Sequence, residues 1–480
     1  MLAAPHISTF PKEEGSKSTQ LKKTKPPRVS LYGQVLDHTE QPMSSTRHPS
    51  TLYKPTWVFA MAVGSAIGWG SFVLPFDWIQ QSGWLGATIG FIIGGSMIGI
   101  IGLNFGVAIR CVPVSGGGVA HALSAGGRVH CAIAGWSLAL GYSSIVALNA
   151  SAVPLIFRSL QPNSNSGLLL YTVAGWDVYL SDVVVSSISI IVFALVATRG
   201  ASISGRFQFI VVSVMTITVL ALLLWTLADS GYDNLQYSQS IPEGRSLFAA
   251  AGMIIAIAPW AYVGFDSIPQ LAGEFSFSPE KARRLILIGI FGATLIYISM
   301  IFVVAMLTGN DANIFQSSAW PIAEAVSSEL GEFGLLLLIV AVSGGIVTGL
   351  NGFYAASSRT LMTMGRAGIL PGKFARLDRV TQTPTVAIYT VMLLCLITPW
   401  FGRAALSWVV DMASVGITVA YFYTSLCVRQ IGKEGTSPGM KERLAPSSTI
   451  RTLGTAGCVL SIVFLTLLLF PGTVKSCVVV

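Results

Sequence analysis

Charged residues are scarce in this chain. Asp, Glu, Lys and Arg make up 10% of its 480 residues, whereas a soluble globular domain carries roughly 25%. Apolar residues reach 52%, and the mean hydropathy is +0.69. So little charge cannot cover the surface of a water-soluble fold, and so much apolar sequence excludes a disordered chain. The composition therefore predicts a protein embedded in a membrane.

Cysteine and histidine are also few, and neither is grouped. The six cysteines stand singly, without a CxxC pair or a Cys/His spacing typical of a metal site. Three of the five histidines lie within the first 50 residues. The cluster of nucleophile, base or metal ligands that an enzyme needs is therefore not visible in the sequence. We expect no enzyme activity, no metal site and no cofactor.

The N-terminal region carries no apolar segment of the kind found in a cleavable signal peptide. Residues 1–50 are polar and rich in Lys, Ser, Thr and Pro. Such a composition cannot bury enough apolar surface to fold on its own. We expect residues 1–55 to form a disordered tail in the cytosol.

Eleven apolar runs are long enough to cross roughly 30 Å of hydrocarbon as helices. They lie near residues 56–76, 87–109, 119–157, 179–198, 207–228, 246–269, 285–307, 334–358, 385–401, 404–428 and 453–471. The eighth is expected to continue as a helix through Gly365. This pattern divides the chain beyond the tail into a ten-helix core over 56–428, a cytosolic loop over 429–452, and an eleventh helix with a short tail over 453–480.

The basic residues predict the orientation of these helices. With the N-terminus in the cytosol, all but four of the 29 Lys and Arg residues fall on the cytosolic side. This asymmetry follows the positive-inside rule, and contact with anionic lipid explains the net charge of +8. We therefore expect no binding to nucleic acid. The predicted partner is the lipid bilayer of a plasma membrane or an organelle membrane.

The first and the sixth predicted helices contain residues that interrupt helical structure. Gly64, Gly68 and Gly70 lie in the middle of the first helix. Pro259 and Gly264 lie in the second half of the sixth. Each glycine weakens a helix by about 1 kcal/mol relative to alanine, and proline removes a backbone donor. We expect both helices to unwind near the middle of the bilayer.

The two expected breaks lie at equivalent positions if helices 1–5 and 6–10 are inverted copies of one unit. Paired broken helices of this kind are typical of a transporter binding site. Hydrocarbon cannot satisfy the unwound backbone, so its N–H and C=O groups must line a cavity and contact a ligand. Amides at helix N-termini suit a carboxylate, and free carbonyls suit an ammonium group or a metal cation. These requirements together describe a zwitterion.

Four ordered segments resemble motifs of the amino acid–polyamine–organocation permeases. They are residues 64–72 (GSAIGWGSF, similar to G-x-x-I-G-x-G-x-F), 113–117 (PVSGG, similar to P-x-S-G-G), 261–266 (AYVGFD, similar to A-Y-x-G-F-D) and 358–361 (SRTL, similar to S-R-x-L). The chain departs from the family pattern at Val119 and Ala367. The resemblance implies an all-α integral membrane protein with the five-plus-five inverted-repeat (LeuT-type) fold and discontinuous helices 1 and 6. The apolar runs predict about eleven transmembrane helices, whereas members of the family usually have twelve. The resemblance also implies a secondary active transporter that moves amino acids by alternating access.

The two breaks and the resemblance together predict a substrate site. Backbone amides of residues 65–70 and the Ser65 hydroxyl are expected to hold a carboxylate, and carbonyls near Ala66 and Ile67 an ammonium. By resemblance, helix 6 adds carbonyls at residues 260 and 261. The predicted substrate-binding residues are Ser65, Ala66, Ile67, Gly68, Trp69, Gly70, Trp260, Ala261, Tyr262, Gly264, Phe265 and Asp266.

Three side chains of helix 6 have more than one interpretation. Trp260 and Phe265 line the pocket or close over it by resemblance, and Trp260 could equally be a packing residue. Asp266 is the only acidic residue deep in this helix, and a bare carboxylate there costs about 2.5–3.5 kcal/mol. It is interpreted either as a contact for a cationic group or proton, or as an anchor at the start of the second half-helix.

The coupling ion is left open by the sequence. By resemblance, a sodium site would use carbonyls at the first break and hydroxyls of the eighth helix, which makes Ala66, Ser343 and Thr348 the candidates. Some proton-coupled relatives carry a lysine midway along helix 5, where this chain has Met215. Na⁺, H⁺ or exchange coupling all remain open. The alternatives for the function are transport of polyamines or other small amines, or a channel.

Overall fold

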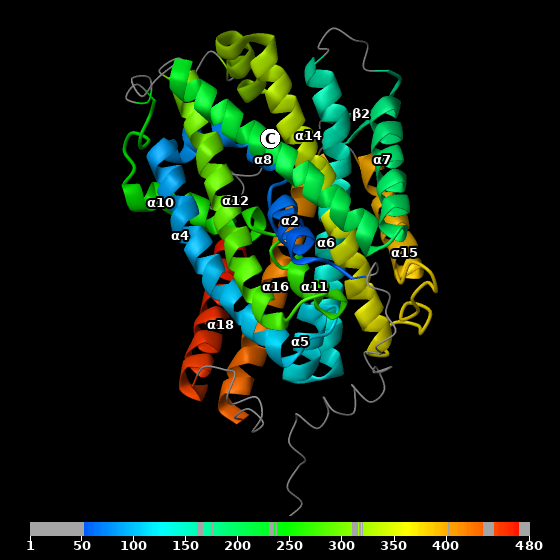
Figure 1. Ribbon diagram of the computed structural model, residues 1–480. Helices are drawn as coiled ribbons and strands as arrows, with labels where there is room; N and C mark the ends of the chain where they lie inside the picture. Colours follow the sequence, from blue (N-terminus) through cyan, green and yellow to red (C-terminus); the bar gives the residue numbers. More distant parts are fainter. Residues whose placement is uncertain are drawn as a thin grey trace, which may run out of the picture.

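The computed structural model is a helical bundle with one small β-hairpin (Figure 1). It describes residues 52–469 except 161–166, 174–175, 230–234, 236–237, 310–314, 316–317, 319, 402–403 and 435–445. The predicted tail up to residue 51 and the residues from 470 onward lie outside this part of the chain. The loop predicted over 429–452 is described only at its two ends, which are helical.

The first half of the chain contains seven named helices and the hairpin. The helices are α2 (Pro55–Ala66), α3 (Gly70–Val73), α4 (Pro75–Cys111), α5 (Gly117–Gly126), α6 (Arg128–Leu160), α7 (Leu180–Thr198) and α8 (Ala201–Asp229). Between α6 and α7, strands β1 (Leu169–Val173) and β2 (Trp176–Tyr179) pair antiparallel, with Leu169 opposite Tyr179. The sequence analysis did not predict this hairpin, because short apolar runs do not distinguish a strand from a piece of helix.

Within its described residues, the second half of the chain has helices as its named elements, joined by turns and loops. Its elements are α10 (Leu247–Ala261), α11 (Ser267–Gln270), the 3-10 helix η2 (Ala272–Glu274), α12 (Pro279–Thr308), α14 (Pro321–Arg366), α15 (Thr385–Cys395), the 3-10 helix η3 (Thr398–Phe401), α16 (Ala404–Glu434) and α18 (Ser447–Leu469). Helices α2, α4, α12 and α14 each begin with a proline. Proline is favoured there because its fixed φ suits the first turn, where the N–H has no helical partner.

Seven helices of the described part of the chain are long and apolar enough to cross a membrane. They belong to α4, α6, α7, α8, α12, α14 and α18, and shorter apolar helices cover Leu247–Ala261 and Thr385–Phe401. This confirms the predicted all-α, multi-span membrane protein. The count of eleven spans and the inverted repeat stay predictions.

The outer helices expose large apolar side chains. Ile188 of α7 is 55% exposed, Ile217 of α8 66% and Phe291 of α12 62%. In water such surfaces would drive association, whereas in a bilayer they contact lipid tails at no cost. The outward faces of these helices are therefore suited to hydrocarbon.

The predicted third span, residues 119–157, is wrong as a single helix. α5 ends at Gly126, and α6 begins at Arg128. The residue between them, Gly127, has a φ of +82°, a conformation that glycine adopts readily and that interrupts a right-handed helix. The eighth span continues beyond Gly365 to Arg366 as predicted, and its helix begins earlier, at Pro321, with a kink at Gly331.

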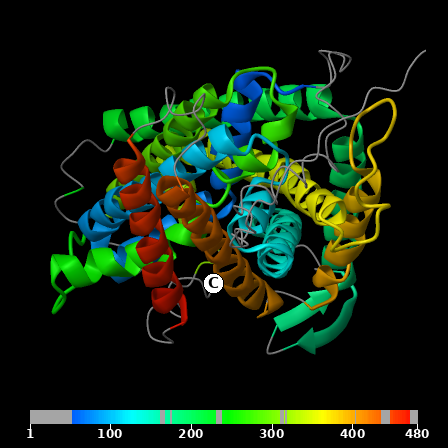
Figure 2. The same cartoon turned by 90° about the horizontal axis from the view of Figure 1, so that it is seen from below.

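Helix α2 lies in the middle of the bundle. Figure 1 shows α4 and α18 on one side of it and α7 and α15 on the other. Figure 2 shows α16 and α18 side by side at one edge, with the hairpin at the periphery. α2 packs against α8, α12 and α14. Its C-terminal end is therefore enclosed by protein rather than by lipid.

A stripe of glycines lets α4 pack closely against α10. A Cβ atom built at Gly86, Gly90 or Gly94 would lie 2.5–2.8 Å from a side chain of α10. The spacing of four residues places these glycines on one face of α4. Small residues at such spacing let two membrane helices approach until their backbones nearly touch. The stripe therefore fixes α10, the first half of predicted helix 6, in place.

We expect Gly90→Ala to destabilise the protein by about 1–3 kcal/mol, because the new methyl group would overpack this interface. The control is Gly99→Ala on the same helix, where no atom lies within 4 Å of the new Cβ and alanine favours the helix by about 1 kcal/mol. The thermal unfolding midpoint of each purified variant in detergent checks this. Equal midpoints for the two variants would contradict it.

Candidate functional site

Both predicted helix breaks are present. α2 ends at Ala66, Ile67 adopts a φ of −92° and a ψ of 81°, and helical structure resumes at Gly70. α10 ends at Ala261, and α11 begins at Ser267. Each break leaves a short stretch of backbone outside regular hydrogen bonding.

The two breaks touch each other through their backbones. Gly264 has a φ of +130°, and a Cβ atom there would overlap the backbone of Ser65 and Ala66. Only glycine combines this conformation with this closeness. Gly264 therefore joins the gap in α10–α11 to the gap in α2–α3.

Tyr297 of α12 connects the ends of the two half-helices. Its hydroxyl lies 2.8 Å from the Ala66 carbonyl oxygen and also contacts the Ala261 carbonyl oxygen. These are the carbonyls of the last residues of α2 and α10. A phenol has one hydrogen, so one donor serves two carbonyls that hydrocarbon could not satisfy.

A cavity of about 40 Å³ lies between the two breaks. Seven of the predicted site residues line it: Ser65, Ala66, Gly68, Trp69, Gly70, Trp260 and Ala261. The sequence analysis did not predict the other lining residues, which are Ser71, Ile145, Leu148, Asn149, Val263, Tyr297 and Phe353. Three of these are on α6, one on α12 and one on α14, so only the folded chain brings them to the breaks.

Several hydrogen-bonding groups at the first break are unused. Within the described residues, no acceptor contacts the backbone N–H of Gly68 or Trp69, and the buried Ser65 hydroxyl has no partner. Gly68 and Trp69 are half-buried and Ser65 is buried. Buried polar groups are normally paired, so unpaired groups at this break call for an explanation. These are groups that the sequence analysis expected to hold a carboxylate.

Asp266 does not line the cavity. Its Oδ2 accepts a hydrogen bond from the Tyr142 hydroxyl at 2.6 Å, and its Oδ1 accepts one from the Gly264 N–H at 2.8 Å. Gln270 donates to the same Tyr142 oxygen at 3.3 Å. These contacts join the second break to α6.

Four other predicted residues do not line the cavity: Ile67, Tyr262, Gly264 and Phe265. Tyr262 donates to the Phe91 carbonyl at 2.8 Å. Phe265 packs edge-on against a ring of α4, with centroids 5.8 Å apart.

The three candidate Na⁺ ligands, Ala66, Ser343 and Thr348, are only partly brought together by the fold. The Thr348 hydroxyl lies 2.9 Å from the Gly64 carbonyl oxygen, which places it beside α2. The Ala66 carbonyl is contacted by Tyr297 instead, and Ser343 is half-buried on α14. In the described part of the chain, no group of three or more His, Cys, Asp or Glu residues could hold a metal ion.

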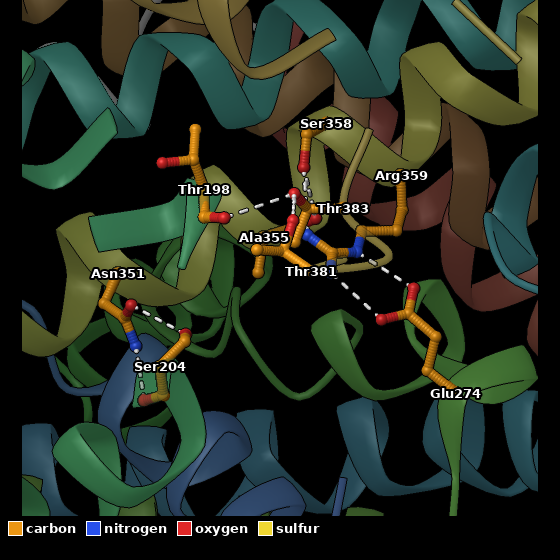
Figure 3. A network of polar contacts seen from close by, with 9 residues as sticks. All are labelled: Thr198, Ser204, Glu274, Asn351, Ala355, Ser358, Arg359, Thr381 and Thr383. Atoms are coloured by element: carbon orange, nitrogen blue, oxygen red, sulfur yellow. Dashed lines mark hydrogen bonds and ion pairs between the residues drawn. The ribbon is translucent and has the colours of Figure 1, made fainter. Parts of the chain in front are cut away.

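A buried ion pair ties α14 to the segment that follows α11 (Figure 3). Nε and Nη2 of Arg359 each lie 3.0 Å from a carboxylate oxygen of Glu274, and Arg359 is 2% exposed. The carbonyl of Glu274 also accepts a hydrogen bond from the Tyr53 N–H at 2.8 Å. Because Tyr53 immediately precedes α2, the pair joins α2, η2 and α14 at one end of the bundle. Arg359 lies in the quoted segment 358–361, whereas Glu274 lies eight residues after the quoted segment 261–266, and the sequence analysis did not predict that they pair.

A second polar network joins α8 to α14 nearby, and Figure 3 shows part of it. Asn351 Oδ1 accepts from the Ser204 hydroxyl at 2.8 Å, and its Nδ2 donates to Gln208 Oε1 at 2.7 Å. Gln208 in turn donates to the Thr348 carbonyl at 3.2 Å. The network fills the space beside α2 with paired polar groups.

The sequence comparisons agree with this geometry. A family model described as amino acid permease matches residues 56–478. The chain therefore belongs to the amino acid permease family. It is 28% identical over 66% of its length to the chloroplastic cationic amino acid transporter 9 of Arabidopsis thaliana, covering 55% of that protein. It is 24% identical over 78% of its length to the branched-chain amino acid permease BcaP of Lactococcus lactis, covering 81% of that protein.

A third relative is the lysine-specific permease LysP of Escherichia coli, which is 21% identical over 75% of this chain and covers 76% of that permease. The chain thus spans little more than half of the plant transporter and most of the two bacterial permeases. Family membership confirms the predicted class, which is a membrane permease and not an enzyme.

We expect Glu274→Ala to destabilise the protein by about 3–5 kcal/mol, because it leaves the buried Arg359 charge unpaired. The control is Glu280→Ala, which removes a 48% exposed carboxylate that lies 3.7 Å from Arg110 and is expected to change stability by about 1 kcal/mol or less. Thermal unfolding of both purified variants in detergent measures the difference. Similar unfolding midpoints would show that the buried pair contributes no more than the exposed one.

Proposed function

We propose that this protein is a secondary active transporter that moves amino acids by alternating access, on the five-plus-five inverted-repeat fold. The observation that supports this most strongly is the cavity between two touching helix breaks. Gly68, Trp69 and Ser65 line this cavity, and within the described residues the two N–H groups and the Ser65 hydroxyl have no hydrogen-bond partner. A carboxylate is the chemical group that accepts all three hydrogen bonds.

The other end of an amino acid suits the same cavity. α2 and α10 end at Ala66 and Ala261, and both residues line the cavity. The C-terminal end of a helix carries a partial negative charge, which favours an ammonium group. The two half-helix ends and the free amides therefore match the opposite charges of a zwitterion.

The lining favours a neutral, apolar substrate side chain. Ile145, Leu148, Val263 and Phe353 contribute apolar surface, and the lining residues include no Asp or Glu. The carboxylate of Asp266 is held by Tyr142 and Gly264 instead. A polyamine or a cationic amino acid would need a carboxylate to replace the water around its side-chain charge, so we propose neutral amino acids as substrates.

Alternating access requires the cavity to open and close. A space of about 40 Å³ holds only a few water molecules, since each needs roughly 10–15 Å³. Trp260 is half-buried, and a Cβ atom at Gly70 would lie 2.9 Å from its ring. We propose that the Trp260 indole closes over the bound amino acid. For the amino acid to leave on the other side of the membrane, the Arg359–Glu274 ion pair would have to separate. The hydrogen bond from the Tyr53 N–H to the Glu274 carbonyl would have to break as well.

We further propose an orientation, a transport core, a coupling site and a location for this permease. The N-terminal tail faces the cytosol, and residues 56–428 form the ten-helix transport core. Ala66, Ser343 and Thr348 are the candidate Na⁺ ligands, with H⁺ and exchange coupling as the alternatives. The membrane is a plasma or organelle membrane; relatives in Arabidopsis are named as chloroplastic and vacuolar proteins.

Uptake by proteoliposomes tests the function and the coupling. Purified protein is reconstituted, and labelled L-leucine, L-lysine and putrescine are offered with and without a Na⁺ gradient and a pH gradient. We expect saturable L-leucine uptake that is stimulated by unlabelled L-leucine inside the vesicles. Uptake of putrescine alone would replace the amino acid proposal, and non-saturable flux would indicate a channel.

We expect Gly68→Ala to raise the KM for L-leucine about tenfold to a hundredfold, because its methyl group fills part of the cavity and overpacking costs about 1–3 kcal/mol. The protein should still fold, since the nearest atom to this Cβ would be 3.8 Å away. Gly99→Ala, outside the cavity, is the control and should keep the wild-type KM. An unchanged KM for Gly68→Ala would place the substrate elsewhere.

A further inference from the structure

Asn149 is a buried side chain in the cavity wall, and half of its amide is unused. It belongs to α6, is 2% exposed and lines the cavity. Its Nδ2 donates to the Ile145 carbonyl at 2.8 Å. Its Oδ1 has no hydrogen-bond partner within the described residues.

The orientation of this amide decides what it can bind. Turning the amide over would place Oδ1 against the Ile145 carbonyl oxygen and lose the Nδ2 hydrogen bond. The unused group is therefore an acceptor and requires a donor. Leaving a buried acceptor unsatisfied costs about 1–3 kcal/mol, and such groups in native structures call for an explanation.

Oδ1 of Asn149 lies close to the first helix break. A Cβ atom at Gly68 would lie 3.8 Å from Oδ1, and one at Gly349 would lie 2.7 Å from it. Oδ1 thus lies between the gap in α2–α3 and helix α14. The Ala66 and Ala261 carbonyls are already contacted by the Tyr297 hydroxyl, whereas Asn149 Oδ1 is an acceptor without any donor.

We infer that Asn149 determines specificity by accepting a hydrogen bond from the α-ammonium of the substrate. This inference rests on the proposed function, in which the substrate carboxylate lies at the N–H groups of Gly68 and Trp69. In an α-amino acid one carbon separates the carboxylate from the ammonium. An acceptor beside Gly68 is therefore placed to meet that ammonium, and it distinguishes an amino acid from the same molecule without its amine.

The test compares two inhibitors that differ only in the α-amine. Inhibition of labelled L-leucine uptake into proteoliposomes is measured with unlabelled L-leucine and with 4-methylpentanoate. The inhibition constant of 4-methylpentanoate is then divided by that of L-leucine, and this ratio measures discrimination for the α-amine. L-lysine and 6-aminohexanoate form the equivalent pair for a carrier that takes up lysine only. A hydrogen bond to a charged group is worth about 1.5–3 kcal/mol, so Asn149→Leu should reduce this ratio by about tenfold or more.

Asn104 offers a matched control. It is fully buried on α4, its Nδ2 donates to the Ile100 carbonyl at 3.0 Å, and its Oδ1 is also unpartnered in the described structure. It does not line the cavity. Asn104→Leu should therefore share any general effect of removing a buried amide but keep the wild-type ratio. Asn149→Asp, which retains an acceptor, should keep or increase the ratio.

The outcomes separate the inference from the proposed function. If Asn149→Leu transports L-leucine with an unchanged ratio, the inference is overturned and the proposed function stands. If the wild-type protein takes up neither amino acid, both are overturned. Should Asn149→Leu fail to fold, Asn149→Ala, which only removes atoms, is measured in its place with the same expected loss of discrimination.

Discussion

The structure depends on satisfying the backbone groups that two broken helices leave unpaired inside a membrane. Hydrocarbon offers them no hydrogen bonds, so their partners must come from the protein or from a bound ligand. Tyr297 contacts the carbonyls that end α2 and α10, and Thr348 contacts the Gly64 carbonyl. Gly264 lets the two gaps lie backbone to backbone. The groups that these contacts leave over, near Gly68, are those available to a ligand.

The need to pair these backbone groups goes with a bundle that has two parts, tightly packed contacts and a small unwound region. The glycine stripe of α4 holds α10, and the pair between Arg359 and Glu274 holds the start of α2 against α14. Both lie away from the cavity, whose own lining is apolar apart from a few polar groups. In the proposed transport cycle, stable packing therefore surrounds a small region of unwound backbone that is able to change its partners.

The site could be predicted only in part. The clustered glycines and the prolines predicted both breaks, and seven of the twelve predicted substrate residues line the cavity. Phe265 was predicted by resemblance, and Asp266 because it is the only acidic residue deep in the sixth predicted helix. The structure turns them towards α4 and α6, where Asp266 meets a tyrosine 124 residues away. Tyr297 gave no signal of its role, because a tyrosine in an apolar helix resembles any packing aromatic.

Residue composition and order were enough to predict a multi-span helical membrane protein, the two points where its helices break and the family to which the chain is similar. These properties depend on local composition, since about 20 apolar residues suffice to span a bilayer and glycine or proline suffices to weaken a helix. Which side chains from other helices meet at the breaks could be learned only from the folded chain. Tyr297, Asn149 and Phe353 come from three different helices and line the cavity, and their convergence follows from helix packing, which no single segment encodes.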